Sequence, residues 1–232
     1  MSKSNASLIV LAELLFFGLV HFFSTEIIVA LNLENALPEM PLVKRAWVGF
    51  AIVVIIITWL TLRRADLRDY GLKGPSPVWR TALFAIIGVV TAITVSTVTD
   101  PFIEEWFGKT DTTVFSGVKG NLGMFLYLLP LIWVFAAFGE EFFYRGFLMT
   151  SVAHVLGGAR IGWFIALIFQ AVIFGLGHEY QGLGGMIGTG LYALVFGGLY
   201  LAAGRNLWAP ALAHGLLDTL GFTLLYLGVI EA

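Results

Sequence analysis

Long apolar runs separated by short polar connections make up most of the chain. A transmembrane helix needs about 20 mostly apolar residues, and runs of that order recur along the whole sequence. The predicted spans are residues 7–31, 46–62, 81–98, 122–156, 159–177, 186–203 and 207–229. Because residues 122–156 are long enough to hold two spans, the pattern predicts an all-α polytopic membrane protein. Its fold would be a bundle of about seven to eight transmembrane helices around a buried polar site.

The polar connections separate helices without separating domains. Breaks are predicted at residues 32–45, which contain Pro38 and Pro41, at 100–121 and at the Gly-rich segment 179–185. We therefore interpret residues 1–232 as a single transmembrane domain. Residues 1–121 supply N-terminal helices and loops, and residues 122–229 form a core that carries the motifs described below.

The first apolar run is interrupted by Glu13, His21 and Glu26. We expect all three side chains to face other helices as packing groups, since lipid-facing charges are costly. No small-residue cleavage pattern follows this run, so we expect it to remain in the protein. Small residues later in the chain, Gly184-x-x-x-Gly188 and Gly197-Gly198, are expected to let helices approach closely.

Basic residues are concentrated after the second span. Arg63, Arg64, Arg68, Lys73 and Arg80 outnumber Asp66 and Asp69 there. The positive-inside rule places this connection in the cytoplasm. Counting spans then puts the N-terminus, Arg160 and Arg205 on the same side. We expect a multi-pass protein of a prokaryotic plasma membrane with a cytoplasmic N-terminus.

Composition agrees with a protein whose surroundings are membrane lipids. Of the 232 residues, 59% are hydrophobic and 12% are charged, whereas soluble domains carry about 25% charged residues; the mean hydropathy is +0.90. A net charge of −2 offers no basic surface for nucleic acid. The chain has no cysteine, which excludes disulfides, thiolate metal sites and a cysteine nucleophile.

Three ionisable residues, Glu140, Glu141 and Arg145, interrupt the long apolar run of residues 122–156. Each such group costs about 2.5–3.5 kcal/mol near the middle of a bilayer on insertion scales, so we infer a function for them. Glu141 and Arg145 are spaced i,i+4 and share a helix face, which favours an ion pair. Glu140 lies about 100° around the helix with no cation nearby in the sequence, which makes it a candidate general base.

Two histidines on other apolar helices can join these groups. Phe174 and His178 are spaced i,i+4, as are His214 and Asp218. If these side chains converge, a carboxylate can deprotonate water while imidazoles stabilise an oxyanion. Alternatively, two histidines and a carboxylate bind Zn²⁺, and a separate glutamate acts as the base. The structural alternative is a helix-joining ion pair and hydrogen-bonded interior histidines.

The motifs resemble those of the CAAX prenyl protease type II and bacteriocin-processing (CPBP) family of intramembrane proteases. Its E-E-x-x-x-R motif matches Glu140, Glu141 and Arg145, its F-x-x-x-H motif matches Phe174 and His178, and its H-x-x-x-N motif, with Asp in some members, matches His214 and Asp218. The resemblance implies that Glu140 activates a water together with His178. It also implies that His214 and Asp218 bind the scissile carbonyl oxygen, while Glu141 and Arg145 orient the site.

Asp218 departs from the family's usual asparagine. An ionised Asp cannot donate a hydrogen bond to an oxyanion, so a metal-free mechanism needs Asp218 protonated or assigned only to orienting His214. A metal mechanism would use His178, His214 and Asp218 as ligands, with Zn as the candidate. Because the sequence has no compact H-E-x-x-H site, we favour the metal-free mechanism.

The sequence leaves three functions open. The resemblance favours an endopeptidase acting on a membrane-associated peptide or on a lipidated, for example prenylated, protein. A non-enzymatic immunity or scaffold protein of the same fold is the main alternative. A transporter using buried carboxylates as a proton relay is disfavoured, because no inverted repeat is visible.

Overall fold

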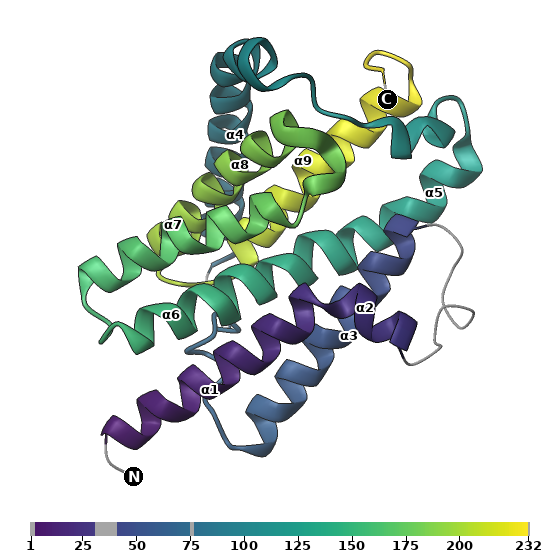
Figure 1. Ribbon diagram of the computed structural model, residues 1–232. Coiled ribbons are helices and arrows are strands. Elements are labelled where there is room, and N and C mark those ends of the chain that lie inside the picture. The colour runs from purple at the N-terminus through teal and green to yellow at the C-terminus, as the bar shows by residue number, and fades with distance from the viewer. Residues whose placement is uncertain (1–2, 31–40, 75–76, 232) are drawn as a thin grey trace.

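A computed structural model describes residues 3–30, 41–74 and 77–231, and every regular element in these ranges is helical (Figure 1). The elements are α1 (Lys3–Phe22), α2 (Ser24–Ala30), α3 (Pro41–Leu62), α4 (Val78–Phe107), η2 (Thr113–Val118), α5 (Leu122–Leu131), η3 (Ile132–Glu140), η4 (Phe142–Met149), α6 (Thr150–Val155), α7 (Arg160–Leu176), η5 (Glu179–Gln181), α8 (Gly182–Ala202) and α9 (Trp208–Tyr226). The break predicted at Pro38 lies outside the described residues, whereas Pro41 begins α3 and does not belong to a loop.

Among the residues that the structure describes, four helices are long and apolar enough to cross a membrane, and two further apolar helices are shorter. The long ones cover Val43–Leu62, Val78–Phe107, Leu122–Val155 and Glu179–Ala202, and the shorter ones cover Ser7–His21 and Arg160–Leu176. The helical fold and these apolar helices define an integral, multi-pass membrane protein, as predicted. The expectation that residues 122–156 hold two spans is wrong, because the helix from Leu122 to Val155 is continuous.

The first predicted span is two helices, because α1 ends at Phe22 and α2 begins at Ser24. Glu13 of α1 is buried and forms a 2.6 Å ion pair with Arg63 of α3, so its predicted packing role is confirmed. Trp59 Nε1 donates a second hydrogen bond to the Glu13 carboxylate, at 2.7 Å. The prediction is wrong for Glu26, which is exposed on α2.

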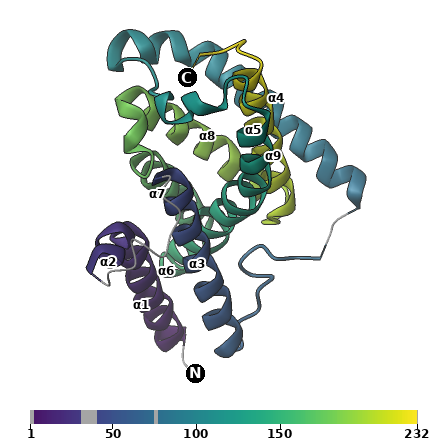
Figure 2. The same cartoon turned by 90° about the vertical axis from the view of Figure 1, so that its right-hand side faces the viewer.

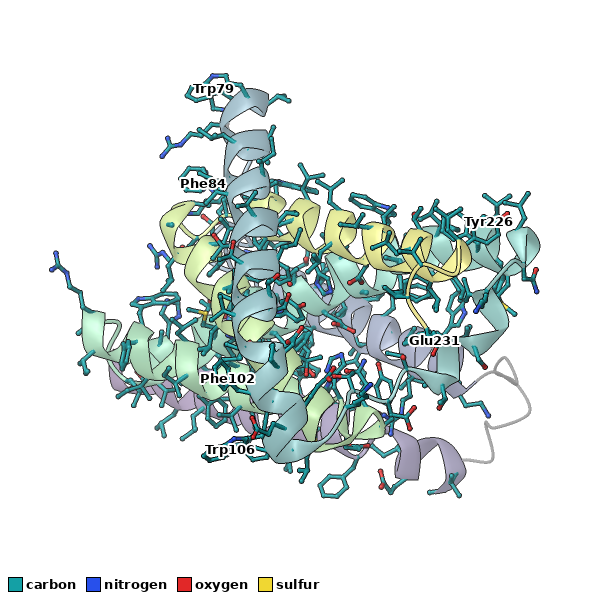
Figure 3. All side chains as sticks on the ribbon, turned by 90° about the horizontal axis from the view of Figure 1, so that it is seen from above. Trp79, Phe84, Phe102, Trp106, Tyr226 and Glu231 are labelled. Carbon is teal, nitrogen blue, oxygen red and sulfur yellow. The ribbon has the colours of Figure 1, made fainter. Side chains whose placement is uncertain are left out.

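Helix α4 extends well beyond its predicted end at residue 98. It continues through Pro101 to Phe107, because an apolar residue, Ile103, resumes contact with the core. Figure 3 shows Trp79 and Trp106 near opposite ends of this helix. The 27 residues between them span about 40 Å at 1.5 Å per residue, which matches a bilayer with its headgroup regions. Tryptophans at both ends are typical of the two membrane interfaces.

The helix from Leu122 to Val155 has π-helical geometry over Ile132–Glu140 and again over Phe142–Met149. Pro130 lies just before the first of these segments, and Gly139 lies within it. π-Helical segments are rare and are often found at functional sites. The two carboxylates predicted to matter, Glu140 and Glu141, lie at the junction of the two segments.

The remaining helices enclose this central helix (Figures 1 and 2). Helices α3 and α9 pack on η3, α1 packs on α6, and α7 and α8 pack on each other. Helix α4 covers α8 and α9. Close approach of α7 and α8 depends on glycine, as predicted: a Cβ at Gly197 would collide with Gln170, and one at Gly175 would lie 2.5 Å from the Met186 carbonyl oxygen.

Candidate active site

A cavity of about 890 Å³ lies between the central helix, the N-terminal half of α3, the C-terminal end of α7 and the C-terminal half of α9. Most of its lining residues are apolar or aromatic. Its charged and histidine lining residues are His21, Arg45, Asp100, Glu140, His178, Glu179, His214, Asp218 and Glu231. The structure therefore brings together the four predicted catalytic residues, Glu140, His178, His214 and Asp218, in one cavity.

Glu141 joins two elements behind the cavity wall. Its Oε1 lies 3.0 Å from Nη1 of Arg145 and 3.0 Å from Nδ1 of His214 on α9. Both Glu141 and Arg145 have fully buried side chains. The predicted i,i+4 ion pair is confirmed, and its carboxylate also fixes a histidine from another helix.

Arg145 has further partners that hold its guanidinium in place. Nη2 donates to the carbonyl oxygen of Ala193 on α8 at 3.3 Å. The guanidinium carbon lies 4.9 Å from the ring centroid of Phe174 and 5.9 Å from that of Phe196. These aromatic faces partly compensate the buried charge through cation–π attraction. Phe174 of the F-x-x-x-H motif thus supports the arginine of the first motif.

His214 has a carboxylate beside each ring nitrogen. Nδ1 donates to Glu141, since a carboxylate can only accept. Nε2 lies 3.5 Å from Oδ2 of Asp218, one helical turn along α9. The ring stacks on Phe196 with centroids 5.3 Å apart. This arrangement favours a ring in which both nitrogens carry protons, and it leaves the Nε2 hydrogen beside the cavity.

Close approach of α9 to the central helix depends on Gly215, the residue after His214. A Cβ at that position would lie 2.7 Å from the ring of Trp133 on η3. Only a residue without a side chain lets the two helices come this close. His214 can therefore reach Glu141 across the helix interface.

His178 follows the end of α7 and is half-buried at the cavity wall. Its Nδ1 lies 2.8 Å from the backbone oxygen of Phe174, and its ring stacks on the Phe174 ring with centroids 4.6 Å apart. Because a carbonyl oxygen only accepts, Nδ1 is the donor. In the neutral ring Nε2 is then an acceptor, so the two histidines differ in hydrogen-bonding character.

Glu140 is the cavity's unpartnered carboxylate. Among the described residues no hydrogen bond or ion pair reaches its side chain, although Glu141 beside it has two partners. A carboxylate that is free of partners and open to a cavity can accept a proton from a bound water.

Two residues at this site were missed or assigned only to packing. His21 of α1 lines the cavity, stacks on Phe143 at 4.0 Å and shares a 3.2 Å hydrogen bond with the Tyr144 hydroxyl group. His21 therefore packs against other helices, as predicted, and also lines the cavity, which was not predicted. Tyr144 lies one helical turn after Glu140, and that spacing is the signal that would have indicated it. Nothing in the sequence links His21 to residues 123 positions away.

The alternative metal site does not fit this arrangement. In the described part of the chain, no three His, Asp or Glu side chains are placed so as to hold a metal ion. The Nδ1 atoms of His178 and His214 are committed to a backbone oxygen and to Glu141, so each ring could offer a metal only its Nε2 atom. The set of His178, His214 and Asp218 is therefore not assembled as a ligand shell.

Comparison with known families agrees with this geometry. Residues 122–220 match the family model for type II CAAX prenyl endopeptidase, Rce1-like. These residues contain the two acidic residues, the arginine and both motif histidines. This part of the chain is similar to that family, which is a family of proteases. Neither a curated protein nor a solved structure matches the chain significantly.

Proposed function

We propose that the protein is an intramembrane endopeptidase in which Glu140 activates water to hydrolyse a peptide bond. One observation carries this proposal: an unpartnered carboxylate lines the same cavity as two histidines of different hydrogen-bonding character. A purely structural cluster would pair Glu140 as well as Glu141, since an unpaired charge in an apolar region is costly.

In this mechanism Glu140 removes a proton from a water molecule held between its carboxylate and Nε2 of His178. The hydroxide adds to the scissile carbonyl carbon and forms a tetrahedral intermediate. The proton on Glu140 then passes to the amide nitrogen as the carbon–nitrogen bond breaks. The products are a carboxylic acid and an amine, and Glu140 returns to its initial state.

The oxyanion needs a donor, and His214 supplies it. Its Nδ1 is held by Glu141, so its Nε2 hydrogen points to a fixed position beside the cavity. Asp218, at 3.5 Å from that nitrogen, orients and electrostatically supports the ring without itself donating. Glu141 and Arg145 do not touch the substrate and act by positioning His214. Removing one oxyanion donor typically lowers kcat by about 10²–10³.

The proposal is tested by comparing new protein termini, by mass spectrometry, in membranes of cells expressing the wild type or Glu140→Gln. Glu105→Gln is the matched control, because Glu105 is exposed on α4 and does not line the cavity. Termini produced by the wild type and the control but absent with Glu140→Gln support proteolysis and name the substrate. Equal termini in all three membranes, at equal protein levels, would instead support the non-enzymatic scaffold or immunity function.

A further inference from the structure

The cavity occupies only one half of the bundle along its length. From α3 it takes residues between Val43 and Val53, and from α9 residues between His214 and Leu225. It also includes Thr110 and Thr112, which follow the end of α4, and Glu231 near the end of the described chain. No described residue of 54–95 or 145–172 lines it. The site therefore opens toward the end of the bundle where α4, α7 and α9 end.

Hydrogen bonds between connections define this open end. The backbone N–H of Asp111 donates to the Gln181 oxygen at 2.9 Å, and that of Gly120 donates to the Tyr226 oxygen at 2.9 Å. Arg45 and Glu179 form a 2.8 Å ion pair at the cavity wall. These contacts gather the connections α4–α5 and α7–α8 and the end of α9 on one side of the molecule.

The opposite end gathers the other connections and most of the cations. Nζ of Lys73 donates to the Gly204 oxygen at 2.6 Å, and the Arg205 guanidinium lies 4.9 Å from the Trp163 ring centroid. Figure 1 shows the start of α1 at the lower left and the yellow end of the described chain at the upper right, at opposite ends of the bundle. The described basic residues near the N-terminal end are Arg63, Arg64, Arg68, Lys73, Arg80, Arg160 and Arg205, and the acidic ones are Asp66, Asp69 and Glu13, the ion-pair partner of Arg63.

The charge balance is reversed at the end where the cavity opens. The described acidic residues there are Asp100, Glu104, Glu105, Asp111, Glu179 and Glu231, and the basic ones are Lys44, Arg45, Lys109 and Lys119. Short basic connections remain on the cytoplasmic side of a membrane. We infer that the catalytic cavity opens on the extracytoplasmic side and takes a polypeptide segment presented from there.

This inference rests on the proposed function and narrows its substrate class. An exported peptide, or the outward-facing part of a membrane protein, reaches Glu140 without crossing the bilayer. A lipidated tail that stays in the cytoplasm would have to pass the half of the bundle into which this cavity does not extend. The favoured substrate is therefore a membrane-associated peptide segment outside the cytoplasm.

The cysteine-free chain provides a direct test of this orientation. Single variants Ser116→Cys, Thr112→Cys and Ala159→Cys place one thiol on the exposed η2 segment, at the cavity and in the exposed connection before α7. Intact cells expressing each variant are treated with a membrane-impermeant maleimide, before and after permeabilisation. The unsubstituted protein is the zero-label control.

We expect Ser116→Cys and Thr112→Cys to label in intact cells, and Ala159→Cys to label only after permeabilisation. Labelling of Ala159→Cys alone in intact cells would overturn the inference. Labelling does not depend on cleavage, so a failed Glu140→Gln comparison with the expected labelling would refute the enzymatic proposal and leave the orientation standing. Substrate cut sites found only in cytoplasmic segments would overturn the inference about the substrate.

Discussion

Replacing Arg145 tests whether the buried ion pair is what holds the site together. Arg145→Met would leave Glu141 with His214 as its one charged partner and would remove the bond to the Ala193 oxygen. Breaking a fully buried pair by deleting one partner costs about 3–5 kcal/mol. Glu141→Gln alone should also be costly, because it leaves the arginine buried without a counter-charge.

The double variant Arg145→Met/Glu141→Gln removes both charges, so its cost should be well below the sum of the single costs. We expect a coupling energy of about 2–3 kcal/mol from the full cycle. The free energy of unfolding is measured for the purified variants in one detergent by denaturant titration. Arg160→Met is the control, because Arg160 is an exposed arginine at the start of α7 and should change stability by no more than about 0.5 kcal/mol.

Additive single costs, to within about 0.5 kcal/mol, would refute the argument that the pair acts as a unit. A stable Arg145→Met variant would do the same. Because Glu141 positions His214, the double variant should also cleave slowly although it is folded. If the double variant cleaved at the wild-type rate, that result would contradict the positioning role of Glu141.

Three further predictions concern packing, Asp218 and metal. Gly146→Ala should destabilise the protein by about 1–3 kcal/mol, because its Cβ would lie 2.6 Å from the Tyr70 carbonyl oxygen; Gly198→Ala, with open space at its Cβ, is the neutral control in thermal unfolding. Asp218→Asn keeps an oxygen acceptor for His214 and adds an N–H donor, so it should cleave at least as fast as the wild type. Asp218→Ala removes the acceptor, and its cleavage rate should be about 100-fold lower. A lower cleavage rate for the asparagine variant than for the alanine variant would contradict this role of Asp218. Incubation with a chelator should leave the cleavage rate unchanged, and loss of activity restored by added Zn²⁺ would contradict the metal-free mechanism.

The sequence predicted the chemistry of the site better than its geometry. The pairing of Glu141 with Arg145, and of His214 with Asp218, follows from helical spacing and is present in the structure. The contact between Glu141 and His214 joins residues 73 positions apart, and no local spacing can predict it. The same is true of the gathering of His178 and Glu140 in one cavity.

Helix boundaries were predicted least well, for reasons visible in particular residues. Asp100 and Pro101 indicate a helix end, yet α4 continues because Ile103 is buried against the bundle. The π-helical segments around Glu140 were not predicted from the sequence; in the structure η3 packs on α3 and α9, and η4 packs on α7. Glu26 was assigned to the interior because the break at Phe23, between the end of α1 and the start of α2, is not apparent in an apolar run.

The rate of cleavage by purified Glu140→Gln tests the central claim most directly. The variant and the wild type would be reconstituted in liposomes with the peptide identified from the wild-type-specific termini. We expect kcat to fall by about 10²–10⁴, with KM and the unfolding midpoint unchanged, because the substitution removes the base and preserves the side-chain shape. Cleavage by Glu140→Gln at the wild-type rate would show that Glu140 does not activate the water.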